Sequence, residues 1–147
     1  MTRVRMTRLG MFFCIAVLAA STHAPAFAAG AIAVGAINGV GVNGVAVGLA
    51  ENEKTGAAAN SYAMHQCQVA KDAKASVRAL CHLVGSYTNK CGSVAIDPNA
   101  RAPGFGWAVA SSSTSASRRA LAKCKATAGA GAANCVVAAT SCDGRAR

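Results

Sequence analysis

Apolar and polar positions along the chain from residue 29 follow a pattern that occurs twice. Short apolar runs at 30–35 and 46–49 predict two strands, and the runs at 92–97 and 107–110 repeat the pattern in the second half. A helix is predicted after each pair of runs, because apolar and small residues recur at spacings of four, one and three and so share one helical face. These positions are Ala59, Ala63, Met64 and Cys67 and, 57 residues later, Ala116, Ala120, Leu121 and Cys124.

Capping residues and a following strand complete each predicted unit. Thr55 and Gly56 precede the first helix, which we expect to run to about Ala70, while the serine-rich run 111–115 offers several N-caps to the second. Strands are predicted next, over 77–84 and 135–140. We therefore expect an α+β fold, a small disulfide-rich domain of two strand-strand-helix-strand repeats. The repeats span about 29–91 and about 91–142, and a short basic tail follows at 143–147.

The segment 39–48 is rich in Gly and Val, with turn signals at Asn38-Gly39 and Asn43-Gly44. It predicts a hairpin between the first two strands. A Gly-rich strand specifies its pairing register weakly, so the same segment also allows pairing with the edge of another chain.

The first 28 residues have the three parts of a secretory signal peptide: the basic residues Arg3, Arg5 and Arg8, the apolar run 9–20, and the small-x-small end at 26–28. The apolar run has 12 residues, fewer than the roughly 20 that a transmembrane helix needs. The sequence predicts one exported domain over 29–147, in the periplasm or outside the cell, and not a transmembrane protein.

Removal of the leader takes Cys14 with it and leaves an even set of six cysteines, which in a short exported chain predicts three disulfides: Cys67, Cys81, Cys91, Cys124, Cys135 and Cys142. Cys135 and Cys142 cannot pair if the strand between them is extended, because its ends would lie roughly 20 Å apart against a limit of about 7 Å. A helix end reaches the start of the following strand, which favours Cys67–Cys81 and Cys124–Cys135. Cys91–Cys142 remains, and we expect it to join equivalent positions of the two repeats.

The mature chain is rich in Ala and Gly, and its only aromatic residues are Tyr62, Tyr87, Phe105 and Trp107. An interior built from Ala buries little apolar area, so each bridge is expected to matter, at roughly 3 kcal/mol. Trp107 is interpreted as a core anchor, with a ligand platform as the alternative.

Twelve basic and five acidic residues remain after residue 28. On a helix from Ala116, the side chains of Arg118, Arg119, Lys123 and Lys125 are expected to lie opposite Ala120, Leu121 and Cys124, and Arg145 and Arg147 add charge in the tail. A solvated helix face explains this periodicity. A functional interpretation is binding of an acidic envelope polymer, anionic lipid headgroups or an acidic protein. Nucleic acid is not expected, because the chain is predicted to be exported.

Candidate chemistry is sparse. His65, Cys67, Cys81 and His82 lack the close spacing of a zinc knuckle, and no free thiol remains as a nucleophile if three bridges form. The serines at 111–117 lack a Gly-x-Ser-x-Gly elbow. Glu51 and Glu53 are predicted in a loop, and turn roles are expected for three further acids, Asp72, Asp97 and Asp143. We therefore expect no catalytic residues, metal or cofactor.

Several short motifs together resemble a known family. They are Gly-Ala-Ile-Ala near residue 30, the Ala-rich helix ending in Cys67, Cys-Gly-Ser-Val-Ala from Cys91, Gly-Trp-Ala at 106–108, Ala-Leu-Ala-Lys-Cys at 120–124 and Cys-Val-Val-Ala from Cys135. Over residues 29–142 the chain resembles the bacterial exported domain of unknown function 4189. The resemblance implies an export signal and a cysteine-rich α+β domain, and it implies no activity.

Three functions remain open from the sequence. The first is a non-catalytic binding or inhibitory module that uses the basic helix face and tail. The second is an envelope-directed hydrolase, and the third is a structural protein that self-associates through the Gly/Val segment.

Overall fold

The computed structural model describes residues 28–99 and 103–147, which form two units with the same order of elements. The first contains β1 (Ala29–Gly35), α1 (Val40–Asn43), β2 (Ala46–Glu53), α2 (Gly56–Gln68), α3 (Ala75–Arg78) and β3 (His82–Tyr87). The second contains β4 (Cys91–Ile96), β5 (Phe105–Ala110), α4 (Ser113–Thr127), the 3-10 helix η1 (Gly129–Asn134) and β6 (Val136–Cys142). The α+β class and the two strand-strand-helix-strand repeats are confirmed. All but the last residue of the predicted signal peptide lies outside the described residues.

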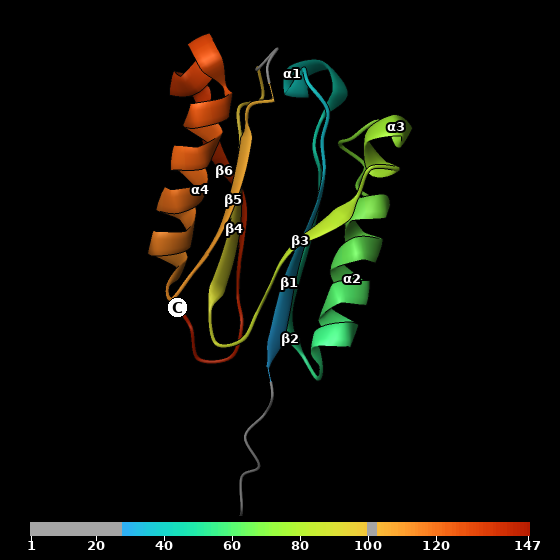
Figure 1. Cartoon of the computed structure of the whole chain (residues 1–147), viewed down its shortest axis with the longest axis vertical. Coiled ribbons are helices and arrows are strands. Elements are labelled where there is room, and N and C mark those ends of the chain that lie inside the picture. The colour runs from blue at the N-terminus through green and yellow to red at the C-terminus, as the bar shows by residue number, and fades with distance from the viewer. Residues whose placement is uncertain (1–27, 100–102) are drawn as a thin grey trace, which may run out of the picture.

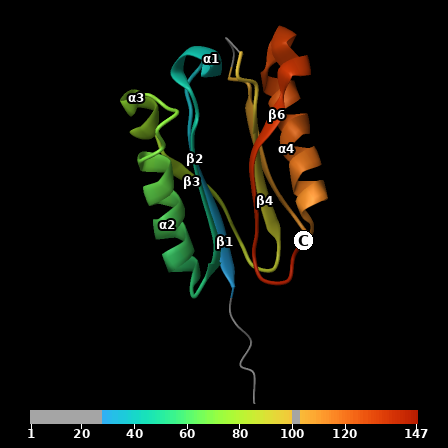
Figure 2. The same cartoon turned by 180° about the vertical axis from the view of Figure 1, so that it is seen from behind.

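Each unit forms one antiparallel sheet of three strands, in the order β2-β1-β3 in the first unit and β5-β4-β6 in the second. The two sheets face each other, with α2 on the outer side of one and α4 on the outer side of the other (Figure 1). The view from behind shows the same four layers, helix, sheet, sheet and helix (Figure 2).

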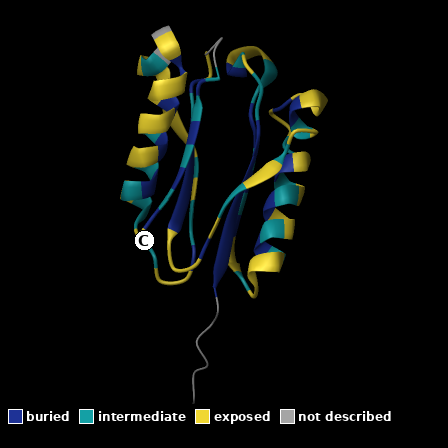
Figure 3. Ribbon diagram, in the orientation of Figure 1, coloured by how far each residue is buried: buried dark blue, intermediate teal, exposed yellow. Residues whose placement is uncertain are grey.

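Alternation along the strands separates small residues from large ones. Toward the helices the sheets present Ala, such as Ala33 and Ala46 beneath α2 and Ala95 and Ala108 beneath α4. Toward each other they present larger side chains, which are buried in a common cluster: Ile32, Val34, Tyr87 and Val94. Side chains alternate between the faces of a strand, so each sheet can serve both layers. Figure 3 shows the buried central strands β1 and β4, while the edge strand β3 and the outer sides of the helices are in part exposed.

A glycine on the second strand of each unit lets the helix lie against the strand backbone. A Cβ on Gly106 would lie 2.6 Å from the carbonyl oxygen of Ala120 and still closer to the amide nitrogen of Cys124. Gly48 meets Ala63 and Cys67 of α2 in the same way. Gly48 and Gly106 are therefore equivalent positions of the two units, and 46–49 corresponds to 104–107. The predicted correspondence of 46–49 with 107–110 was wrong by three residues. The hydrophobic pattern did not reveal this, because the alignment of β2 with β5 depends on the position of the glycine beneath each helix.

The correspondence of 30–35 with 92–97 is confirmed. Ala33 pairs with Gly48 in the first sheet, and Ala95 pairs with Gly106 in the second. The helical stripes also correspond as predicted, because Ala59, Ala63 and Cys67 in α2 and Ala116, Ala120 and Cys124 in α4 are all fully buried.

The three disulfides are the predicted ones, Cys67–Cys81, Cys91–Cys142 and Cys124–Cys135. The role expected for Cys91–Cys142 was wrong. Cys91 begins β4 and lies directly opposite Cys142 of β6 in the same sheet, so this bond does not join the two repeats. Each of the three disulfides lies within one unit.

The strand predicted over 77–84 begins only at His82, because the preceding residues form α3. Val77 is buried against the α2 side of the sheet, and the Arg78 guanidinium donates to the carbonyl oxygen of Ala73 at 2.6 Å. A helical turn both buries Val77 and returns the chain to bring Cys81 to Cys67. An extended chain could not do both.

The predicted hairpin of 39–48 is confirmed as the connection between β1 and β2, with the single turn α1 inserted. Gly39 and Gly44 flank α1 with φ of 80° and 74°, the left-handed values that Asn-Gly turn signals predict. The predicted caps are also present, since Thr55 accepts from the Ala58 amide at 3.1 Å and Ser112 from the Ser115 amide at 3.3 Å.

Among the helices of the described ranges 28–99 and 103–147, none combines the length and the apolar character needed to cross a bilayer.

We expect Gly106→Ala to lower the free energy of unfolding by about 1–3 kcal/mol, because the added methyl group forces α4 away from β5. Chemical denaturation of the oxidised protein measures this change. Gly56→Ala is the control, since nothing lies within 4 Å of a Cβ at the start of α2. Equal losses for both variants would contradict the close packing at Gly106.

Candidate functional site

The four predicted basic residues of α4 are all exposed, and they lie on two flanks of the helix. Arg118 and Lys125 line a shallow hollow together with Leu121. Lys123 lies on the other flank, where its ammonium nitrogen is 4.5 Å from the centre of the Trp107 ring. The expected arrangement therefore needs correction, because Leu121 lies between two of the cations and is only half-buried. Ala120 and Cys124 face the sheet as expected.

The basic tail is held at the N-terminal end of α4. The Ser113 amide donates to the main-chain oxygen of Arg147 at 3.0 Å, and the Ala146 amide donates to that of Asp143 at 3.3 Å. Arg145 and Arg147 are exposed there. Since a helix rises 1.5 Å per residue, the tail and the last basic residue of α4, Lys125, are separated by about 18 Å along the helix axis.

The repeat provides an internal comparison for these charges. At the helix offset of 57, the four basic residues of α4 correspond to residues of α2 that carry no charge: Ser61, Tyr62, Gln66 and Gln68. The segment 98–142 contains no Asp or Glu at all. Between residues 98 and 142 the second unit therefore has basic residues and no acidic ones. The first unit has neutral residues at the equivalent positions of α2.

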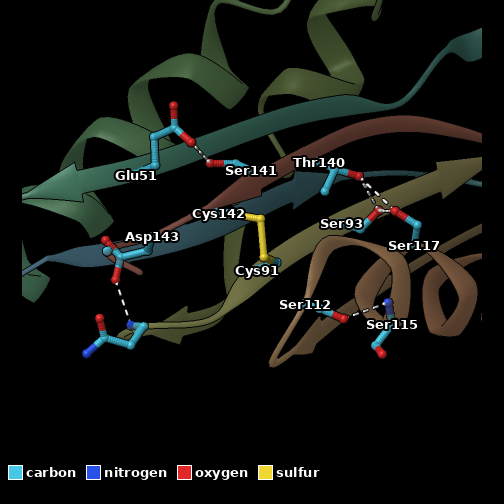
Figure 4. The surroundings of a disulfide bond; sticks show 12 residues. Glu51, Cys91, Ser93, Ser112, Ser115, Ser117, Thr140, Ser141, Cys142 and Asp143 are labelled. Carbon is cyan, nitrogen blue, oxygen red and sulfur yellow. Dashed lines mark hydrogen bonds between the residues drawn. A yellow bond between two sulfur atoms is a disulfide. The ribbon is translucent and has the colours of Figure 1, made fainter. Parts of the chain in front are cut away.

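A buried carboxylate joins the two units (Figure 4). Asp143 is fully buried, and its two oxygens accept from the amides of Asn52 and Asn89, each at 3.0 Å. Both asparagines have positive φ, 55° and 50°. A turn role was predicted for Asp143 because Gly144 follows it, and its carbonyl oxygen does accept from the Ala146 amide across that turn. Its side chain has a second role, because it ties the end of β2 at Asn52 to the bend at Asn89. No pattern in the sequence links these three residues.

Tyr87 fills the space between the facing sheets. Its ring lies against Gly30 of its own sheet and Gly92 of the other, where a Cβ would come within 2.6 Å and 2.9 Å of ring atoms. Its hydroxyl lies 3.3 Å from the carbonyl oxygen of Ala50 and 3.5 Å from that of Ser141. Burial raises the pKa of the Tyr87 phenol above its ordinary value, and the negative charges of Asp143 and Glu51 add to the effect.

The two glutamates predicted in a loop lie instead at the end of β2, so that prediction was wrong. Glu51 and Glu53 line a hollow of about 400 Å³ with Leu49, Tyr62, Thr140 and Ser141. The Ser141 hydroxyl donates to Glu51 at 2.6 Å (Figure 4). The hollow joins strands of both units, β2 and β6, which the sequence separates by about 90 residues.

The remaining acids and serines lie in turns, on the surface or in hydrogen bonds within the second unit. Asp97 accepts from the Asn99 amide at 2.9 Å, in agreement with the predicted turn role, and Asp72 is exposed. Ser93, Ser117 and Thr140 share hydroxyl hydrogen bonds of 2.8–3.4 Å beneath α4 (Figure 4).

The cysteines and histidines considered for zinc do not form a metal site. Cys67 and Cys81 are bonded to each other, so neither offers a thiolate. His65 and His82 are exposed, and the His82 ring nitrogen Nδ1 lies 3.0 Å from the carbonyl oxygen of Leu80. Within the described part of the chain, no three His, Cys, Asp or Glu side chains cluster as metal ligands would.

Comparison with known families gives a match to DUF4189, a domain of unknown function, over residues 29–142. The resemblance seen in the sequence is thereby confirmed. No curated protein and no solved structure matches the chain.

We expect the stability of the protein to fall above about pH 10 and Tyr87→Phe to weaken this dependence. The unfolded chain releases the phenolic proton near pH 10, whereas the folded chain retains it to higher pH, so rising pH favours unfolding. Denaturation curves from pH 8 to 11 give the difference between wild type and variant. Tyr62, which is exposed, supplies the control Tyr62→Phe. An equal change in the control would contradict the assignment to Tyr87.

Proposed function

We propose that this chain, which belongs to the DUF4189 family, is an exported, non-catalytic module that binds acidic partners. The α4 basic surface is the part of the molecule that binds, and it consists of Arg118, Arg119, Lys123 and Lys125 together with Arg145 and Arg147 of the tail. The partner is an acidic envelope component or an acidic protein. When that partner is an enzyme, binding makes the module an inhibitor.

The difference in charge between α4 and α2 carries this proposal. Both helices bury the same stripe against the same kind of sheet, so folding requires no charge on their outer faces. Arg119 and Lys123 are also four residues apart, where like charges destabilise a helix by about 0.2–0.5 kcal/mol. A solvated helix face can be built from neutral polar residues, as in α2, and does not by itself require the cations of α4. A binding role explains why α4 carries four cations where α2 has neutral residues.

Uncompensated charge favours an anionic partner. No acidic residue occurs between 98 and 142, and the two oxygens of Asp143 already accept hydrogen bonds from amides. An exposed surface of one sign attracts ligands of the opposite sign and raises their rate of association. The same charges would suit nucleic acid, which an exported protein does not ordinarily meet.

Export is supported by the six paired cysteines and by the leader predicted over residues 1–28. Structural disulfides persist in oxidising compartments and are rare in the cytosol.

An envelope hydrolase is the second candidate, favoured by the hollow that contains Glu51, Glu53 and Ser141. A hydrolase would cleave labelled wall polymer and lose that activity in Glu51→Gln or Glu53→Gln. A self-associating structural protein is the third, through the segment that contains α1, where Val42 is 70% exposed. Its assembly would depend on concentration and would weaken when residues 38–44 are replaced.

We expect the combined variant Arg118→Ser, Lys123→Gln and Lys125→Gln to bind polyglutamate about tenfold more weakly than wild type at low salt. Three exposed contacts of about 0.5 kcal/mol each account for this loss. The substitutions copy Ser61, Gln66 and Gln68, residues that the fold already uses at the equivalent positions. Binding is measured by calorimetry, and wild-type affinity should fall steeply as salt rises.

The matched control removes three exposed lysines elsewhere, by Lys54→Gln, Lys71→Gln and Lys90→Gln. It changes the net charge equally and should retain most of the binding. If both variants lose affinity to the same extent, net charge alone is responsible and the α4 basic surface is not the site. Binding that does not respond to salt would also contradict the proposal.

A further inference from the structure

The outer edge of β5 carries main-chain groups that point away from the sheet. β5 is an edge strand in the order β5-β4-β6. At Phe105 the Thr127 hydroxyl accepts from the amide at 3.2 Å and donates to the carbonyl oxygen at 2.8 Å. Main-chain groups of alternate residues in an antiparallel strand point to the same side. The N–H and C=O groups of Trp107 and Val109 therefore also face outward, and no further strand of the described chain pairs with them.

A hollow of about 300 Å³ adjoins this edge, between β5 and the flank of α4. Phe105 and Trp107 supply aromatic surface, and Ala126 and Thr127 line the α4 side. Lys123 places its ammonium group 4.5 Å from the Trp107 ring centre, which fixes a cation next to the free strand edge. Arg119 precedes it by one turn on the same flank.

The equivalent edge in the first unit is also an edge strand beside a hollow, but it lacks the tryptophan, the cation and the threonine hydroxyl. Leu49 of β2 corresponds to Trp107. Gln66 corresponds to Lys123, and Ala70 corresponds to the hydroxyl-bearing Thr127. The β2 edge ends in Glu51 and Glu53 and so has the opposite charge. The fold itself therefore requires neither the aromatic ring, the cation nor the hydroxyl at the β5 edge.

We propose that the β5 edge binds an acidic segment of a partner protein in extended conformation, which adds to the sheet as a fourth strand. Outward N–H and C=O groups repeat every second residue, a spacing that a polypeptide backbone matches and a polysaccharide does not. Acidic side chains of the segment on the α4 side would lie near Lys123 and Arg119. Apolar side chains on the opposite face would lie near Trp107. This inference rests on the proposed function and narrows the partner to a polypeptide.

The test uses the oxidised protein and a synthetic peptide of alternating Val and Glu, with both ends blocked. Trp107 is the only tryptophan in the chain, so its fluorescence reports on this edge alone. We expect a saturable change in fluorescence as the peptide is added. Polyglutamate and polygalacturonate serve as comparison probes, measured by calorimetry under the same conditions.

Two further peptides carry N-methyl groups on alternate backbone amides. In one peptide the odd-numbered residues are methylated, and in the other the even-numbered residues. An added strand uses only one of its edges, so one methylated peptide should bind at least tenfold more weakly and the other about as well as the parent. Each lost hydrogen bond accounts for a loss of affinity of about two- to twelvefold.

Val109→Pro removes an outward N–H at an edge position, where proline is tolerated. The variant should lose peptide binding and keep its binding of polyglutamate to α4. Lys123→Gln, which copies Gln66, should weaken peptide binding several-fold even if the proline variant fails to fold.

The outcomes separate the two proposals. If both methylated peptides bind as well as the parent, strand addition is wrong and the α4 basic surface alone explains binding. Binding of polygalacturonate without binding of the peptide overturns a polypeptide partner. If wild type binds none of the three probes, the proposed function fails as well. A protein that is already dimeric without peptide, and loses its dimer in Val109→Pro, would assign the edge to a second copy of the chain.

Discussion

Contact between each helix and the bare backbone of the second strand in its unit is the constraint on which the rest of this structure depends. Gly48 and Gly106 permit this contact, and any Cβ there would collide with main-chain atoms of α2 or α4. A helix so close to a sheet leaves room mainly for small residues between them, most of them Ala and Cys. The large apolar residues are then confined to the opposite face of each sheet. That face must be covered, so two units pack sheet against sheet.

Among the described residues, no disulfide crosses the junction between the units. All three disulfides connect elements of one unit, where they fix the end of each helix to the following strand and β4 to β6. Across the junction, Tyr87 packs between glycines of both sheets, and Asp143 accepts from the amides of Asn52 in β2 and Asn89 in a bend. Buried polar groups of this kind stabilise only when every partner is present. Reduction should therefore loosen each unit first, and the junction fails as a consequence.

The two units share one frame and differ at the surfaces that we propose to bind a partner. The frame repeats down to the buried stripe of each helix and the glycine beneath it. The outer surfaces do not repeat, because α4 has four cations and α2 has none. Trp107, Lys123 and Thr127 likewise replace Leu49, Gln66 and Ala70 beside the second edge strand. The internal repeat thus separates the residues that folding needs from those that it does not need.

The sequence by itself determined the local and periodic features of this protein: two repeats, the stripe of each helix, a cap at Thr55 and another within the run 111–115, and the pairing of all six cysteines. These features depend on residues close together in the chain or on the reach of an extended strand, which spacing records directly. Tertiary structure alone decided the three-residue shift between 46–49 and 104–107, the helical turn at Val77, and the placement of Cys91–Cys142 inside one sheet. It also decided that the Asp143 side chain joins Asn52 to Asn89, and that Glu51 lies against Ser141. Each of these depends on which atoms of distant segments meet, and a pattern of hydrophobic and polar positions along one chain carries no information about that contact.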